Sequence, residues 1–148
     1  MNNDEFYMKI AINEAKKAYN RGEVPVGAVI VKENRVISKA YNTKNKKNCV
    51  INHAEILAIK KASKKLKNWR LNDCTMYITL YPCSMCASAI NQSRISKIVI
   101  GADNNSNNHN IVDKILFDKS NGTDIVIVNN ILKNDCGKLL KQFFLKKR

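Results

Sequence analysis

The sequence predicts an α/β protein, a three-layer α/β/α arrangement around a five-stranded mixed sheet. Segments with the helical spacing of apolar residues alternate along the chain with short apolar runs typical of strands. A short charged turn joins the first two of these runs, which indicates a hairpin that opens an otherwise mostly parallel sheet. The 148 residues, 45% of them hydrophobic, suit one domain with a buried core, so we expect a single domain over residues 1–148.

The first part of the chain predicts one helix and two strands. Asp4 can cap the helix. The expected buried stripe of this helix consists of Phe6, Ile10, Ala11, Ala15 and Ala18. The apolar run 26–31 is typical of a buried strand, and the turn at 32–34 leads to a second strand over 35–40.

The rest of the chain predicts helices that alternate with strands. The first is a helix over 53–66, with an expected stripe of Ile56, Ile59, Ala62, Ser63 and Leu66. Pro82 favours an extended approach to the next helix, over 84–93. The other expected elements are strands over 74–80, 97–102 and 124–128, a loop over 103–110, and helices over 111–117 and from about 134.

The net charge of +14 allows a polyanion as partner but does not require one. Lysine and arginine strengthen binding to phosphates because they release counterions. However, the 21 Lys, 21 Asn and 17 Ile are also what the codons of an AT-rich genome would favour, whatever the function. No apolar run approaches the roughly 20 residues of a membrane span. The charged N-terminal segment lacks the apolar stretch of a secretory signal, so we expect a cytoplasmic protein that does not enter a membrane.

Two short segments carry the residues suited to metal chemistry. They are His53-Ala54-Glu55 and Pro82-Cys83-Ser84-Met85-Cys86, and each lies where a helix is expected to begin. One imidazole and two thiols supply three zinc ligands, which leaves a fourth position for water, as in catalytic sites. A carboxylate two residues after the histidine can stand beside the metal and move protons to and from that water.

Three other interpretations of these residues stay open at the sequence level. Cys49 could complete a structural four-ligand zinc site with His53 and the Cys-x-x-Cys pair. A thioredoxin-like redox pair is a second possibility, although it leaves His53 and Glu55 without a role. Third, the thiols could be small buried hydrophobes, which is what we expect of Cys74 and Cys136. An odd total of five cysteines argues against a disulfide framework.

The pattern H-x-E…P-C-x-x-C is the signature of zinc nucleobase deaminases. Beyond it, the chain resembles the bacterial tRNA-specific adenosine deaminases, within the cytidine-deaminase-like superfamily, over nearly its whole length. The stretches that carry this resemblance are 22–29 (GEVPVGAV), 53–56 (HAEI), 69–71 (WRL), 77–87 (YITLYPCSMCA), 93–95 (SRI), 101–103 (GAD) and Phe143-Phe144.

The resemblance implies zinc-dependent hydrolysis of adenosine to inosine at the wobble position of tRNA, with one Zn²⁺ per subunit of a homodimer. It implies that His53, Cys83 and Cys86 hold the metal and that Glu55 is the catalytic proton shuttle. It further implies substrate-binding roles: Asn42 hydrogen-bonds the flipped base, Val26 forms a wall of the pocket, the backbone amide of Ala54 helps to polarise the reacting centre, and Asp103 and Asn104 lie on the substrate side.

The chain departs from the family pattern at three places. Tyr81 stands where the family usually has Glu before Pro-Cys. Asn104 replaces an acidic residue, and the loop 105–110 replaces a glycine-rich one. Gly122-Thr123 stands where the family has Asn-His. Because these places resemble the RNA-contacting side of the family, the sequence supports the deamination chemistry better than the substrate.

The substrate therefore has two candidates, the anticodon stem-loop of tRNA and a free base or nucleoside of the guanine or cytosine type. A third, non-enzymatic alternative is a structural zinc module. For RNA contacts we expect Phe144, Lys146, Lys147 and Arg148 near the C-terminus to be the main candidates. The basic run over 60–70 is expected to be partly a solvated helix face and partly a source of phosphate contacts.

Overall fold

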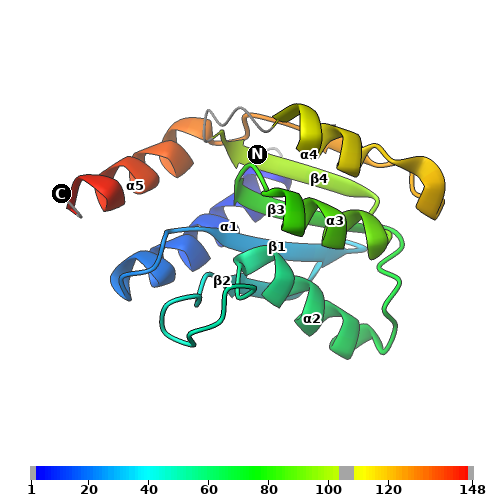
Figure 1. The fold of residues 1–148 in the computed structure, drawn as a ribbon, viewed down its shortest axis with the longest axis horizontal. Helices are drawn as coiled ribbons and strands as arrows, with labels where there is room; N and C mark the ends of the chain where they lie inside the picture. The colour runs from blue at the N-terminus through cyan, green and yellow to red at the C-terminus, as the bar shows by residue number, and fades with distance from the viewer. Residues whose placement is uncertain (1–2, 104–108, 147–148) are drawn as a thin grey trace.

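The computed structural model describes residues 3–103 and 109–146, and it shows three layers (Figure 1). A five-stranded sheet forms the middle layer. In chain order the elements are α1 (Asn3–Asn20), β1 (Gly27–Lys32), β2 (Arg35–Tyr41), α2 (Ala54–Leu66), β3 (Cys74–Leu80), α3 (Ser84–Gln92), β4 (Lys97–Ala102), α4 (His109–Leu116), the short 3₁₀ helix η1 (Lys119–Asn121), β5 (Val126–Val128) and α5 (Lys133–Lys146). The predicted α/β class and order of elements are confirmed.

The strand order in the sheet is β2-β1-β3-β4-β5. β1 pairs antiparallel with both β2 and β3, whereas β3, β4 and β5 pair in parallel. The sheet is therefore mixed, as predicted. However, two of its four strand pairings are antiparallel, whereas the sequence predicted only the antiparallel pairing of the hairpin. The reason is that β1 runs against the other strands and lies between β2 and β3, so that both of its pairings are antiparallel.

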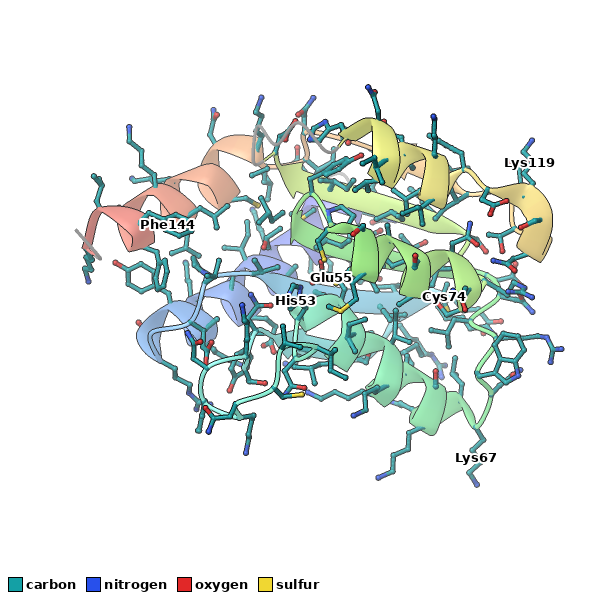
Figure 2. The ribbon with its side chains drawn as sticks, viewed as in Figure 1. His53, Glu55, Lys67, Cys74, Lys119 and Phe144 are labelled. Carbon is teal, nitrogen blue, oxygen red and sulfur yellow. The ribbon has the colours of Figure 1, made fainter. Side chains whose placement is uncertain are left out.

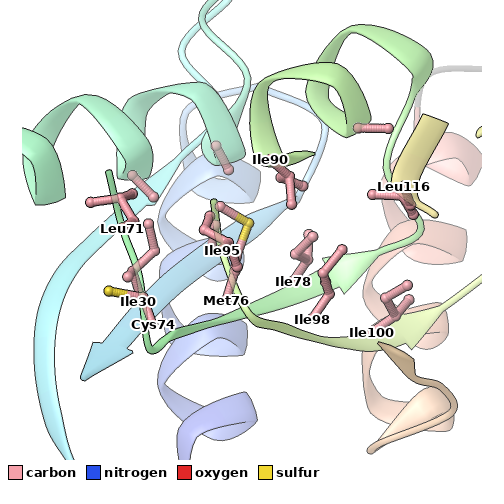
Figure 3. Packing of buried hydrophobic residues seen from close by; sticks show 14 of the residues in the cluster. Ile30, Leu71, Cys74, Met76, Ile78, Ile90, Ile95, Ile98, Ile100 and Leu116 are labelled. Carbon is pink, nitrogen blue, oxygen red and sulfur yellow. The ribbon is translucent and has the colours of Figure 1, made fainter. Parts of the chain in front are cut away.

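Alternate residues of the strands face two separate hydrophobic clusters. On one face, α2, α3 and α4 cover Ile30, Met76, Ile78, Ile98 and Ile100 (Figure 3). On the other face, α1 and α5 cover Val29, Val31, Tyr77 and Val99. Two glycines allow close packing of helices on this second face. A Cβ at Gly27 would lie 2.0 Å from the Ala11 carbonyl oxygen, and one at Gly101 would lie 2.5 Å from Cys136 Sγ.

Two predicted helix stripes are only partly correct. In α1, Ala11, Ala15 and Ala18 are fully buried as predicted, but Phe6 is 51% exposed, and Tyr7 and Met8 are buried at this end of the helix instead. In α2 the fully covered residues are Ala54, Glu55, Ala58 and Ala62, while the larger residues of the predicted stripe are half-buried at the edge. Small side chains at the centre of α2 let it approach the sheet closely.

The bounds of the later elements differ modestly from prediction. α4 begins at His109, inside the predicted loop, and β5 is confined to Val126–Val128. No helix among the described residues is long and apolar enough to cross a membrane.

Candidate metal centre and active site

The three predicted metal ligands meet between the N-termini of α2 and α3. His53 is the N-cap residue of α2 and Cys83 is the N-cap residue of α3, both with extended backbone, and Cys86 lies one turn into α3. Their ligand atoms all lie within 4.8 Å of one another. His53 Nδ1 is 3.7 Å from Cys83 Sγ and 3.5 Å from Cys86 Sγ.

The two distances from His53 Nδ1 to the sulfur atoms fit a zinc ion. Tetrahedral coordination at about 2.0–2.3 Å places neighbouring ligand atoms roughly 3.3–3.8 Å apart. A helix N-terminus also favours thiolate over thiol, because it carries partial positive charge. One imidazole and two thiols are ligands that bind zinc in preference to harder divalent ions such as Mg²⁺.

Electrostatics already favour one thiolate in this cluster. A hydrogen bond from Cys86 and another from His53 lower the pKa of Cys83 to about 4, against the effect of burial. The same pairing with Cys83, together with burial, raises the pKa of Cys86. The hydrogen bond with Cys83 raises the pKa of His53. The three side chains thus share protons that a divalent metal would displace.

Glu55 lies beside the ligands without belonging to the group that they form (Figure 2). It is 4% exposed, and its charge interacts with His53, Cys83 and Cys86. Burial raises the pKa of its carboxyl group. Within the described residues, Glu55 Oε1 is buried without a hydrogen-bond partner. A buried carboxylate oxygen left open next to three metal ligands is suited to receive a proton from a water molecule at the fourth position.

Three of the predicted substrate-binding residues are joined by hydrogen bonds. The Asn42 N–H donates to the Val26 carbonyl at 3.2 Å, and the Ala54 N–H donates to Asn42 Oδ1 at 2.7 Å. The amide oxygen of Asn42 is therefore engaged, which leaves its NH₂ group for a ligand. The substrate role of the Ala54 amide stays a prediction, since this N–H serves Asn42 in the structure.

The fourth cysteine considered for the metal site lies apart. Cys49 is half-buried, and it is not a member of the ligand cluster found among the described residues. The site therefore has the three-ligand composition of a catalytic centre. Cys74 and Cys136 are buried in the two cores, as predicted, and burial raises the pKa of Cys136 to about 12.

Tyr81, two residues before Cys83, contacts residues that lie far from it in the sequence, and the sequence did not predict these contacts. Its hydroxyl donates to Asp113 Oδ1, and its ring stacks on His109 with centroids 4.0 Å apart. His109 Nε2 in turn lies 2.8 Å from Asp103 Oδ1. These residues line a cavity of about 390 Å³ together with Asn129 and Asn130 at the end of β5. Asn104 lies outside the described residues.

Glu23 is a functional candidate that the sequence did not reveal as such. It is 2% exposed, and its two carboxylate oxygens accept the backbone N–H groups of Asn45 at 3.0 Å and Lys46 at 2.8 Å. This fixes the loop that leads from Asn42 to His53. The only sequence signal for Glu23 was its place in the GEVPVG stretch, and this stretch does not indicate that Glu23 binds the backbone of Asn45 and Lys46.

The C-terminal candidates are only partly described. Phe144 is 54% exposed, next to the buried Phe143, which packs edge-on against Tyr19 at 6.1 Å. Lys146 Nζ lies 4.9 Å from the centre of the Tyr19 ring. Lys147 and Arg148 lie outside the described residues.

Three residues able to hold a metal ion beside a buried carboxylate are the arrangement with which zinc-dependent deaminases act on nucleobases. Comparison with known proteins narrows this class. Residues 1–102 match the family described as "Cytidine and deoxycytidylate deaminase zinc-binding region", and the chain belongs to that family.

Two similar relatives share one description. The chain is 42% identical to a tRNA-specific adenosine deaminase of Bacillus subtilis (strain 168), over 100% of this chain and 92% of the relative. It is 39% identical to one of Buchnera aphidicola subsp. Schizaphis graminum (strain Sg), over 99% of this chain and 97% of the relative.

Solved structures show the same fold. One, from studies of A-to-I editing by tRNA:A34 deaminases at the wobble position of transfer RNA, has a TM-score of 0.83 and 32% identity, and covers 91% of this chain and 99% of that chain. A guanine deaminase from Bacillus subtilis has a TM-score of 0.65 and 37% identity, and covers 70% of this chain and 66% of that chain.

Proposed function

We propose that this protein is a zinc-dependent hydrolase that converts adenosine to inosine at the wobble position of tRNA, with release of ammonia. The observation that carries the chemistry is the open carboxylate oxygen of Glu55 beside the cluster of His53, Cys83 and Cys86. The names of the full-length relatives and the A-to-I editing structure support the tRNA substrate.

His53, Cys83 and Cys86 hold one Zn²⁺ per subunit. When bound, zinc supplies an activated water close to neutral pH. Glu55 accepts a proton from the attacking water and delivers it to N1 of adenine, so that oxygen adds at C6. Glu55 then takes the remaining proton of the added hydroxyl and passes it to the amino group, so that the C6–N bond breaks, ammonia leaves and the C6=O bond of inosine forms. Its buried position suits this exchange, because burial raises the pKa of the carboxyl group toward the working pH.

The base is held by the residues joined to the first turn of α2. Asn42 presents its NH₂ group to an acceptor on the base, since its oxygen is bonded to Ala54. Val26, 5% exposed, and the His53 ring form walls of the pocket. Asp103 and Asn104 bind the flanking nucleotides. Phe144, Lys146, Lys147 and Arg148 contact the anticodon stem-loop.

The functional unit is a cytoplasmic homodimer whose interface helices help to shape each active site. Ile111, in the first turn of α4, is 57% exposed, and Phe117, which directly follows α4, is 51% exposed. α4 packs beside α3, which carries Cys86, so this apolar surface lies next to the metal-binding helix. It is the surface on which we expect the second subunit to pack.

Deamination of a free base is the second candidate. It is favoured by the likeness to a guanine deaminase over 70% of this chain. Mass spectrometry for inosine after incubation of the zinc-loaded protein with an anticodon stem-loop tests the first proposal, with free guanine, cytosine and adenosine as parallel substrates. If only a free base is turned over, deamination of a free base replaces tRNA deamination as the proposed function.

A further inference from the structure

An exposed tryptophan is in contact with two arginines at the end of the molecule away from the metal ligands. Trp69 is 52% exposed, in the connection between α2 and β3. The guanidinium carbon of Arg70 lies 4.4 Å from the centre of the Trp69 ring, and that of Arg94, from the connection between α3 and β4, lies 5.2 Å from it. We call these three residues the Trp69 surface.

The backbone beneath the Trp69 surface is fixed. The Leu71 N–H donates to the Ser93 carbonyl at 2.7 Å, and the Asp73 N–H donates to Ser96 Oγ at 2.9 Å. Leu71 and Ile95 are both fully buried in the core, so they anchor the two connections. The arginines are therefore presented from a rigid base rather than from free loops.

The charge of the Trp69 surface is not balanced locally. Among the ion pairs of residues 3–103 and 109–146, none includes Arg70 or Arg94, although Arg94 Nη1 donates to the Gln92 carbonyl at 2.8 Å. Asp73 is the only acidic residue between Glu55 and Asp103 in the sequence. The exposed lysines nearby along the chain are Lys64, Lys65 and Lys67. Positive charge held together in this way is suited to an anion.

We propose that the Trp69 surface docks the phosphate backbone of RNA outside the anticodon stem-loop. Guanidinium groups stacked on an aromatic ring keep their N–H edges free, and these edges match phosphate oxygens in bidentate geometry. Stacking also pre-organises the two arginines, which reduces the entropy lost on binding. The proposal rests on the proposed function in one respect, that the RNA is the tRNA substrate.

The position of the Trp69 surface excludes direct contact with the reacting nucleotide. His53 caps the start of α2, whereas Lys67 caps its end, and the 13 residues between them span about 20 Å. Figure 2 shows Lys67 and Cys74 well away from His53 and Glu55. The phosphates bound there therefore belong to another arm of the tRNA, and this surface is separate from the C-terminal RNA-contact candidates.

The test compares two RNA probes with an Arg70→Gln/Arg94→Gln variant. The probes are a full-length tRNA transcript with adenosine at the wobble position and its isolated anticodon stem-loop. We expect the variant to bind the full-length tRNA several-fold more weakly, with a salt slope of log affinity smaller by about 1 for each lost phosphate contact. Deamination of the stem-loop should be unchanged, which shows that the variant is folded and holds zinc.

A Lys9→Gln/Lys16→Gln variant is the matched control, because it removes the same charge from exposed positions of α1, on the opposite face of the sheet. Equal weakening by both variants would overturn the proposal, since it would indicate a nonspecific charge effect. Unchanged tRNA affinity and salt slope would also overturn it, and an altered oligomeric state in sedimentation would then assign the surface to subunit contacts. Failure of the wild-type protein to deaminate the stem-loop would instead contradict the proposed function.

Discussion

The Ala54 backbone N–H donates a hydrogen bond of 2.7 Å to Asn42 Oδ1, which joins the predicted base-binding residue to the first turn of the metal-binding helix α2. Asn42 thereby satisfies one of the open N–H groups at the start of the helix. Because His53 is the N-cap residue of α2 and makes no side-chain capping bond, this contact takes the place of a local cap.

Substitutions at Asn42 should separate its role in capping α2 from its predicted role in binding the base. Asn42→Ala loses the bond to Ala54, and we expect a loss of stability of about 1 kcal/mol as well as of activity. Asn42→Asp keeps the acceptor oxygen but lacks the NH₂ group, so it should keep the melting temperature and lose activity. Thermal unfolding and deamination kinetics check this. Activity of Asn42→Asp close to that of the wild type would contradict the role in base binding.

Glu23 should act on the substrate through the loop that it holds. In Glu23→Gln, one of the two N–H groups of Asn45 and Lys46 loses its charged acceptor, at a cost of about 1–3 kcal/mol. We expect faster hydrogen exchange over residues 43–52 and a higher KM, with a smaller change in kcat. Hydrogen exchange with mass spectrometry and steady-state kinetics measure both.

Glu14 offers the matched control for Glu23. It is also a buried glutamate, 4% exposed, but its ion pair among the residues that the structure describes is with the exposed Lys17 at 2.6 Å. Glu14→Gln should therefore cost less than about 1 kcal/mol and leave KM unchanged. A similar rise of KM in both variants would mean that Glu23 acts only through overall stability.

Thiol labelling should report metal binding. In protein treated with a chelator, Cys83 is exposed and its pKa of about 4 makes it a thiolate at pH 7, so iodoacetamide should modify it. Cys136 is buried with a pKa of about 12, so roughly one molecule in 100,000 carries its thiolate at that pH, and it should stay unmodified. Added zinc should protect Cys83. Labelling of Cys83 that is unchanged by zinc, measured peptide by peptide, would argue against the metal site.

Tyr81 should stabilise the fold without holding the metal. Tyr81→Phe removes the hydrogen bond to Asp113 but keeps the ring that stacks on His109, and we expect a loss of about 1–2 kcal/mol in the free energy of unfolding. Urea denaturation measures this loss. Zinc content should be unchanged, so a loss of zinc in Tyr81→Phe would show that the residue supports the ligand loop.

The sequence was sufficient to predict the elements that hold the ligands. The strands Cys74–Leu80 and Lys97–Ala102 have the predicted bounds, because each is a short apolar run with clear polar ends. His53, Cys83 and Cys86 lie close together because both motifs lie where a helix begins, and Glu55 lies beside them.

What the sequence did not reveal depends on contacts between distant residues. Glu23 meets Asn45 and Lys46 through their backbone N–H groups, which carry no sequence signal. His109 was assigned to a loop, yet it begins α4 and stacks on Tyr81. Phe6 has the right spacing for burial, but the orientation of α1 on the sheet selects Tyr7 and Met8 instead.

The central claim is that Glu55 transfers protons beside a zinc ion held by His53, Cys83 and Cys86. The most direct test measures inosine by mass spectrometry after incubation of the anticodon stem-loop with zinc-loaded wild-type protein or Glu55→Gln, with zinc quantified in both. We predict inosine from the wild type and a loss of at least about 100-fold in Glu55→Gln with zinc retained. Undiminished turnover by zinc-loaded Glu55→Gln would contradict the account.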